Sequence, residues 1–177
     1  VHVHQSSAAI DLLKQLGFTS AQRSYRELDK ILRRNETHAN DFADESGAHV
    51  DLHWHVLEEN LARDADTEFW EGSVPLQLGD TTTRALNQTD TLLHVCVHGF
   101  RDGRESPIRW IADAMTIINT SHEEIDWDRL AAQAVKHGVN LRLPATLRYL
   151  SSAFGAPIPA GCLHRISAAP IAIREHV

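Results

Sequence analysis

An aspartate and three histidines alternate with apolar residues in the segment 48–56. The polar members are His49, Asp51, His53 and His55, and the apolar members are Val50, Leu52, Trp54 and Val56. Carboxylates bind hard cations such as Mg²⁺ or act as bases, and imidazoles bind Zn²⁺ or transfer protons. The period of two predicts a β-strand with one packed face and one polar face. The solvated face of an ordinary antiparallel strand gives the same pattern, so the segment alone leaves both interpretations open.

A second set of polar side chains interrupts two apolar segments further along the chain. His94 and His98 are four residues apart in the segment 87–98, and Arg109 and Asp113 are four residues apart in the segment 107–118. Residues at this spacing share one face of a helix. Because both helices are otherwise too apolar to face water, we expect the four side chains to form one connected polar cluster in which Asp113 is buried. The imidazoles are either ligands or substrate contacts, or structural groups hydrogen-bonded to Asp113 or to backbone.

The elements that position these residues fall into two regions of different pattern. The region 1–86 predicts an α+β part with a small mixed or antiparallel sheet, and the region 87–177 predicts an all-helical part. In the first region we expect strands at 1–4, 37–43, 48–56, 74–78 and 81–86, a helix that ends at Gly17, and a helix or loop at 25–34. In the second we expect helices at 87–98, 107–118, 126–137 and 143–154, with one more helical piece in the tail.

Composition narrows the classes of protein that fit the chain. The 177 residues carry 17 basic and 24 acidic side chains, a net charge of −7, which argues against a large nucleic-acid-binding surface. No apolar segment approaches the length of roughly 20 residues that a membrane-spanning helix needs. Cys96 and Cys162 are far apart and lack the spacing of a metal site, so we expect reduced, buried thiols in a cytoplasmic protein.

Several short motifs occur in an order that resembles a family of uncharacterised nucleotidyltransferases in the DNA polymerase β-like superfamily. They are Leu16-Gly17-Phe18, Val50-Asp51-Leu52-His53-Trp54, Leu92-Leu93-His94 with His98, Trp110 with Asp113-Ala114, Asp126-Trp127, and Phe154-Gly155-Ala156-Pro157-Ile158-Pro159. The resemblance implies part of a nucleotidyltransferase domain followed by a helical domain. It also implies transfer of a nucleoside monophosphate from a nucleoside triphosphate to an unknown acceptor, with Asp51 as a Mg²⁺ ligand or base. The further candidate site residues are His53, His94, His98, Arg109 and Asp113.

One part of the family pattern is absent from the sequence. The family carries a Gly-Ser loop and an Asp-x-Asp pair on the strand before its first helix, whereas this sequence begins with Val-His-Val-His and has Met115 as its only methionine. By the resemblance, the two acids would lie upstream of Val1. Nucleotidyl transfer needs clustered carboxylates to hold Mg²⁺. We therefore expect the intact protein to use Mg²⁺, and this fragment to bind no cofactor, to be inactive alone and to expose Asp51 close to the start of the chain.

Two other classes of function remain open at the level of sequence. The first is a zinc-dependent hydrolase, because His53 and His55 are two residues apart on a strand and His94 and His98 offer further ligands. The second is a non-catalytic binding module that uses the helical half as its interaction surface. Stoichiometric zinc would favour the hydrolase, and an upstream Asp-x-Asp would favour the nucleotidyltransferase.

Overall fold

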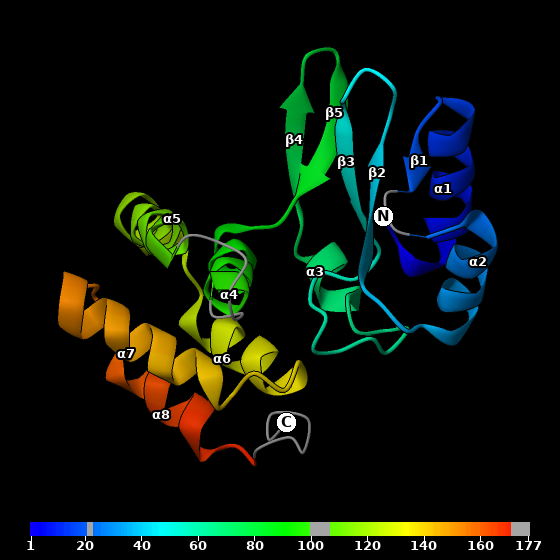
Figure 1. Cartoon of the computed structure of the whole chain (residues 1–177). Helices are drawn as coiled ribbons and strands as arrows, with labels where there is room; N and C mark the ends of the chain where they lie inside the picture. Colours follow the sequence, from blue (N-terminus) through cyan, green and yellow to red (C-terminus); the bar gives the residue numbers. More distant parts are fainter. Residues whose placement is uncertain (21–22, 100–106, 171–177) are drawn as a thin grey trace. The chain divides into compact units, whose positions relative to one another are not determined.

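The computed structural model describes residues 1–20, 23–99 and 107–170. The chain divides into two compact units, Val1–Asp66 and Thr67–Val177 (Figure 1). The first unit combines helices with a three-stranded sheet, and the second combines helices with a two-stranded sheet. The predicted α+β fold is confirmed, and of the two sheet types that the sequence left open, both sheets are antiparallel.

The first unit is built from two helices and three strands in the order β1-β2-β3. Its elements are η1 (Val3–Gln5), α1 (Ser6–Gln15), β1 (Thr19–Ser20), α2 (Tyr25–Arg34), β2 (Ala39–Ala43) and β3 (His49–His53). The strand predicted at 1–4 is wrong, because this segment forms a 3₁₀ turn. The Gln5 amide donates to His2 O at 2.8 Å and the Ser6 hydroxyl donates to Val3 O at 2.7 Å. These local hydrogen bonds compete with strand pairing.

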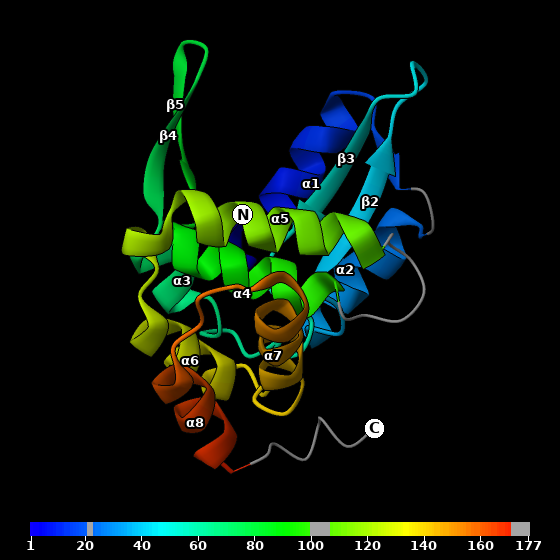
Figure 2. The ribbon, with the colours of Figure 1, turned by 90° about the vertical axis from the view of Figure 1, so that its left-hand side faces the viewer.

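The core of the first unit lies between the sheet and its two helices. Ile10 of α1, Leu28 of α2, Phe42 of β2 and Trp54 are buried together, and Leu52 packs against them. Figures 1 and 2 show α1 and α2 on the same side of the β2–β3 pair. Because side chains alternate along a strand, the residues of β3 next to Leu52 point to the opposite face of the sheet.

Local signals fix both ends of α2. Ser24 caps its start: the Ser24 side chain accepts from the Glu27 amide, and the Glu27 carboxylate accepts from the Ser24 amide at 2.7 Å. Hydrogen bonds from the Ser24 side chain and backbone hold the pKa of Glu27 below its usual value. The helix ends at Asn35, which has the left-handed φ of 55° that asparagine tolerates at such positions. This end of α2 brings the Asn35 side chain to the site described below.

The turn between β2 and β3 sets the register of the hairpin. Asp44 Oδ1 accepts from the amides of Ser46 and Ala48, each at 2.9 Å, and Gly47 adopts a φ of +86°. The Ser46 side chain and these amides hold the pKa of Asp44 below its usual value. The resulting register places Asp41 of β2 directly opposite Asp51 of β3.

The second unit consists of one hairpin and a set of packed helices. Its elements are α3 (Thr67–Glu71), β4 (Val74–Leu78), β5 (Thr81–Ala85), α4 (Gln88–Gly99), α5 (Pro107–Thr120), η2 (His122–Glu124), α6 (Trp127–Lys136), α7 (Arg142–Phe154) and α8 (Ala160–Ala168). The prediction of helices without strands after residue 86 is confirmed for the described part of that region. The compact units nevertheless divide after Asp66 rather than after Leu86, so the β4–β5 hairpin belongs to the helical unit.

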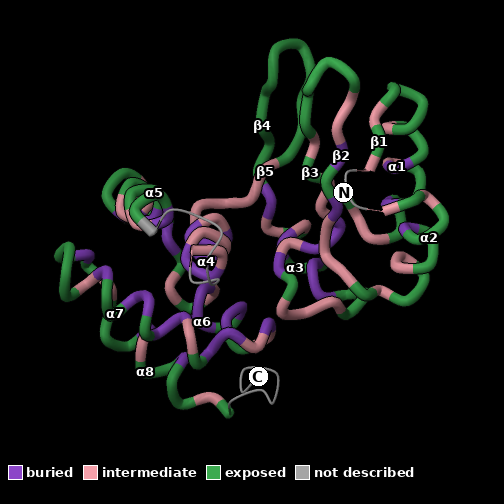
Figure 3. The backbone as a smooth tube through the Cα atoms, in the orientation of Figure 1, coloured by how far each residue is buried: buried purple, intermediate pink, exposed green. Residues whose placement is uncertain are grey.

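Burial within the second unit is uneven (Figure 3). Helix α4 packs against α5, α6 and α7, and buries Leu92, Leu93, Cys96 and Val97. In contrast, β4 is exposed along its whole length, with Leu78 at 60% exposure. None of the described helices has both the length and the apolar content that crossing a membrane requires.

Candidate functional site

Asp51 lies on the face of the sheet that points away from α1 and α2. It alternates along β3 with Val50 and Leu52, which face the core side. Its side chain is 55% exposed, as expected from the sequence. Asp41 is its cross-strand neighbour and is also exposed. The side chains of directly opposed residues on one face of a sheet lie close together, so this face presents two carboxylates.

His53 contacts Asp51 from two residues further along the same face of β3. The distance from His53 Nε2 to Asp51 Oδ2 is 2.7 Å. The His53 ring also meets the His38 ring edge to face, with centroids 5.1 Å apart and an interplanar angle of 70°. On its other side, His38 Nδ1 is 3.6 Å from Glu58 Oε2. We call Asp51 and His53 together the Asp51–His53 pair.

The start of the chain lies beside the end of β3. The Val1 nitrogen donates to His53 O at 2.9 Å. Asp51 is therefore exposed on a strand whose end lies beside the first residues, although those residues form no strand. That its carboxylate points toward residues upstream of Val1 stays a prediction.

His55 is separated from the Asp51–His53 pair because β3 ends at His53. The His38 carbonyl accepts from both the Trp54 amide and the His55 amide, at 2.9 and 3.1 Å, which breaks the alternation of the strand. The His55 side chain is fully buried: Nδ1 is 2.7 Å from Asp66 Oδ2, and Nε2 is 2.9 Å from Asn35 Oδ1. Asp66 Oδ1 also accepts from the Val56 amide at 3.0 Å. Both ring nitrogens of His55 are thus engaged away from His53, and the described residues give the zinc interpretation of this strand no support.

The structure corrects the predicted burial of the polar residues on α4 and α5. His94 and His98 are half-buried, and their rings stack with centroids 5.0 Å apart. Arg109 and Asp113, however, are exposed. Helix α5 buries only the narrow stripe of Trp110, Ala114 and Ile118 among its described side chains, so its polar stripe faces solvent. Asp113 consequently has no buried cation to neutralise.

The described residues do not supply a complete metal site. No group of three or more His, Cys, Asp or Glu side chains among them has the geometry to hold a metal ion. Mg²⁺ prefers several oxygen ligands in octahedral geometry, and one oxygen of the Asp51 carboxylate is hydrogen-bonded to His53. The chain as described therefore fits one contributor to a Mg²⁺ site, and the His-rich zinc alternative has no support within the same residues.

The cysteines are excluded as nucleophiles by their burial. Cys96 and Cys162 are free and buried. Burial raises the pKa of Cys96 to about 12 and that of Cys162 to about 11. The thiolate is the reactive form, so both thiols stay protonated and inert at neutral pH. This agrees with the prediction of reduced, buried thiols.

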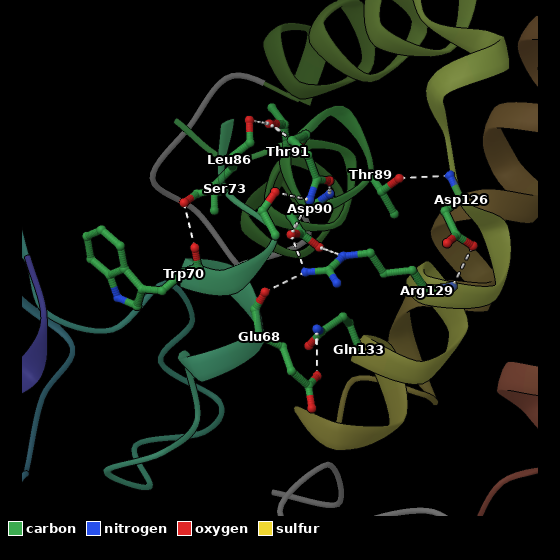
Figure 4. Close-up of polar contacts among 12 residues, drawn as sticks. Glu68, Trp70, Ser73, Leu86, Thr89, Asp90, Thr91, Asp126, Arg129 and Gln133 are labelled. Atoms are coloured by element: carbon green, nitrogen blue, oxygen red, sulfur yellow. Dashed lines mark hydrogen bonds and ion pairs between the residues drawn. The ribbon is translucent and has the colours of Figure 1, made fainter. Parts of the chain in front are cut away.

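An ion pair between a partly exposed arginine and a buried carboxylate, which the sequence analysis did not single out, joins α4 to α6 in the second unit (Figure 4). Asp90 is completely buried, and its two carboxylate oxygens accept from Arg129 Nε at 2.9 Å and from Arg129 Nη2 at 2.7 Å. Asn87 Nδ2 donates to Asp90 Oδ2 at 2.8 Å, and Arg129 Nη2 also donates to Glu68 O at 2.7 Å. Every strong acceptor in this network is satisfied, so we assign it a structural role.

One sequence signal, and one close approach that only the structure shows, mark this network. Asn87 and Asp90 have the spacing of a capped helix start, and the Asp90 amide donates to Asn87 Oδ1 at 2.9 Å. Gly72 lies where a Cβ atom would come within 2.6 Å of Arg129 Nη2. The pairing itself joins residues 39 positions apart, and local patterns do not predict such contacts.

One comparison with known proteins assigns the chain to a family. The model of a family described as uncharacterised nucleotidyltransferases matches residues 1–155, and the chain belongs to that family. No curated protein and no solved structure matches the chain.

Proposed function

We propose that the protein transfers a nucleoside monophosphate from a nucleoside triphosphate to an acceptor, and that Asp51 is an essential carboxylate of this reaction. Family membership over residues 1–155 supports the reaction class. The observation that carries the assignment of Asp51 is its place on the outward face of β3, where its side chain is accessible and the fold does not bury it. An accessible carboxylate can bind a ligand, and a position on a sheet strand holds it in a defined place.

The proposed reaction makes one bond and breaks one bond. An acceptor hydroxyl oxygen attacks the α-phosphorus, the bond from that phosphorus to the bridging oxygen of the β-phosphate breaks, and pyrophosphate leaves. The hydroxyl proton has to pass to a base. An ionised carboxylate such as that of Asp51 accepts a proton when it lies within hydrogen-bonding distance of the hydroxyl.

Mg²⁺ is part of the proposal as the cation that would neutralise the triphosphate. The described residues offer Asp51 to it but do not complete its coordination. The family resemblance puts an Asp-x-Asp pair ahead of the first helix, so we propose that the remaining carboxylates come from residues outside this sequence. The nucleotide and the acceptor hydroxyl are the two substrates, and the acceptor is unspecified.

Isotope placement tests the reaction class. The protein tested includes the residues encoded upstream of Val1. It is incubated with Mg²⁺, with a cell extract as the source of acceptors, and with one nucleoside triphosphate at a time. Each nucleoside triphosphate is labelled on either the α- or the γ-phosphate. We expect a product labelled only from the α-phosphate, with the γ-label released in pyrophosphate. A product labelled from the γ-phosphate, or hydrolysis to a free monophosphate without transfer, would refute the proposal.

A further inference from the structure

Two histidines flank Asp51 in the sequence, and they differ in exposure and in their contact with its carboxylate. His49 and His53 are each two residues from Asp51, on the same face of β3. By sequence the two are equivalent. In the structure His53 is bonded to Asp51 at 2.7 Å and only partly exposed, whereas His49 is exposed. Of these two histidines, His53 therefore makes the specific contact with Asp51.

The chemistry of the contact fixes the position of one proton. An ionised carboxylate only accepts hydrogen bonds, so the Nε2 atom of His53 must carry the proton that Asp51 Oδ2 accepts. One carboxylate oxygen is thereby held. For Asp51 Oδ1 there is no hydrogen bond to any described residue, so this oxygen stays available.

The surroundings of His53 hold its ring in place. The ring of His38 packs against it edge to face at 5.1 Å. The backbone of His38 is held beside the end of β3, because its carbonyl accepts two amide hydrogen bonds, from Trp54 and His55. The His53 carbonyl accepts from the Val1 nitrogen. Backbone and ring contacts therefore act together on the residue that holds Asp51.

We propose that His53 is a positioning residue for the reaction: it orients the Asp51 carboxylate so that Oδ1 faces the reacting groups. An exposed aspartate otherwise samples several rotamers, and a reaction that depends on carboxylate geometry loses rate when the carboxylate is not preorganised. Residues that support a reacting or ligating group in this way typically contribute 10- to 100-fold to activity. This inference rests on the proposed nucleotidyl transfer.

Three variants of the protein that includes the upstream sequence test the role. We expect His53→Ala to lower kcat by about 10- to 100-fold while KM for the nucleoside triphosphate changes by less than about 3-fold. His53→Gln keeps an N–H donor at similar reach and should recover most of kcat. His49→Ala is the matched control and should leave kcat unchanged. The unfolding midpoint of each variant should match the wild type.

Several results would overturn the positioning role. They are an unchanged kcat in His53→Ala, an equal loss in His49→Ala, and a failure of His53→Gln to recover activity despite a normal unfolding midpoint. A wild-type protein without label transfer would refute the proposed function instead.

Imidazole ¹H–¹⁵N spectra test the contact itself, independently of turnover. We expect the Nε2 atom of His53 to be protonated in the wild type, and the His53 signals, but not those of His49, to shift in Asp51→Ala. Unshifted His53 signals would show that the contact does not form.

Discussion

The first unit contains two carboxylate–histidine pairs with the same 2.7 Å contact and opposite surroundings. In the Asp51–His53 pair the side chains are 55% and 31% exposed, whereas in the pair of Asp66 and His55 they are 9% and 0% exposed. The buried pair uses both imidazole nitrogens and both carboxylate oxygens on partners within the protein. In the exposed pair, Oδ2 of Asp51 contacts His53, and Oδ1 has no hydrogen bond to a residue in the described part of the chain.

Because the two pairs share one contact distance but differ in burial, the contact alone does not identify a functional residue. Burial with full hydrogen bonding indicates a structural role, because removing either partner leaves an uncompensated polar group. Exposure with a single fixed partner indicates a group that is oriented yet accessible. Asp90 of the second unit belongs with the buried type, since both of its oxygens are satisfied by Arg129 and Asn87.

The largest loss of stability should follow removal of Arg129, the cation that pairs with the buried carboxylate of Asp90. Arg129→Ala leaves the carboxylate of Asp90 buried without its cation, and we expect a loss of about 3–5 kcal/mol in the free energy of unfolding. Urea denaturation measures it. The matched control is Arg33→Ala, because Arg33 also contacts a carboxylate at 3.0 Å but its side chain is 76% exposed. The control should lose less than about 1 kcal/mol, and equal losses would contradict the distinction by burial.

A smaller loss should follow disruption of the buried carboxylate–histidine pair. Asp66→Ala removes the acceptors of the His55 ring and of the Val56 amide, both at about hydrogen-bonding distance. We expect a loss of about 2–3 kcal/mol for these unsatisfied groups. Urea denaturation followed by circular dichroism measures it. A loss below about 0.5 kcal/mol would show that the pair of Asp66 and His55 contributes no more stability than an exposed pair, which would contradict the distinction by burial.

The smallest effect should come from the capping carboxylate of α2. The pKa of Glu27 is held below its ordinary value of 4.5, mainly by the Ser24 side chain. A lowered folded-state pKa contributes stability that is present above the ordinary pKa and is lost as the pH falls through the folded value. Ser24→Ala should therefore cost about 1 kcal/mol at pH 7, and less at a pH well below 4.5, where Glu27 is protonated. Denaturation at both pH values checks this, and a cost that does not depend on pH would contradict it.

Much of the local structure follows from the sequence. The alternation around Asp51 and the helix that begins near Asp126 are local signals, and each appears in the structure where the sequence predicts it. The alternation failed at His55, because the strand ends where the His38 carbonyl bonds two successive amides. That bond depends on a segment far from His55 in sequence.

The burial of polar side chains is harder to predict from the sequence than the helices and strands are. The α5 helix contains enough apolar residues to suggest burial all round, yet Ile108 is 75% exposed and only one stripe packs inward. Asp113 therefore faces solvent, while Asp90, on a helix of similar composition, is buried opposite Arg129. Which face packs is decided by neighbouring helices, and a periodic pattern of one segment does not contain that information.

The decisive measurement for Asp51 is the turnover of the Asp51→Asn variant. Asparagine keeps the shape of the side chain and removes its charge. The matched control is Asp29→Asn, because the Asp29 side chain is also 55% exposed and also contacts one basic residue. In the protein that includes the upstream sequence, we predict that Asp51→Asn lowers pyrophosphate release by about 100-fold or more, with the free energy of unfolding within about 0.5 kcal/mol of the wild type, and that Asp29→Asn retains full activity. Unchanged release in Asp51→Asn, or equal losses in both variants, would contradict the assignment.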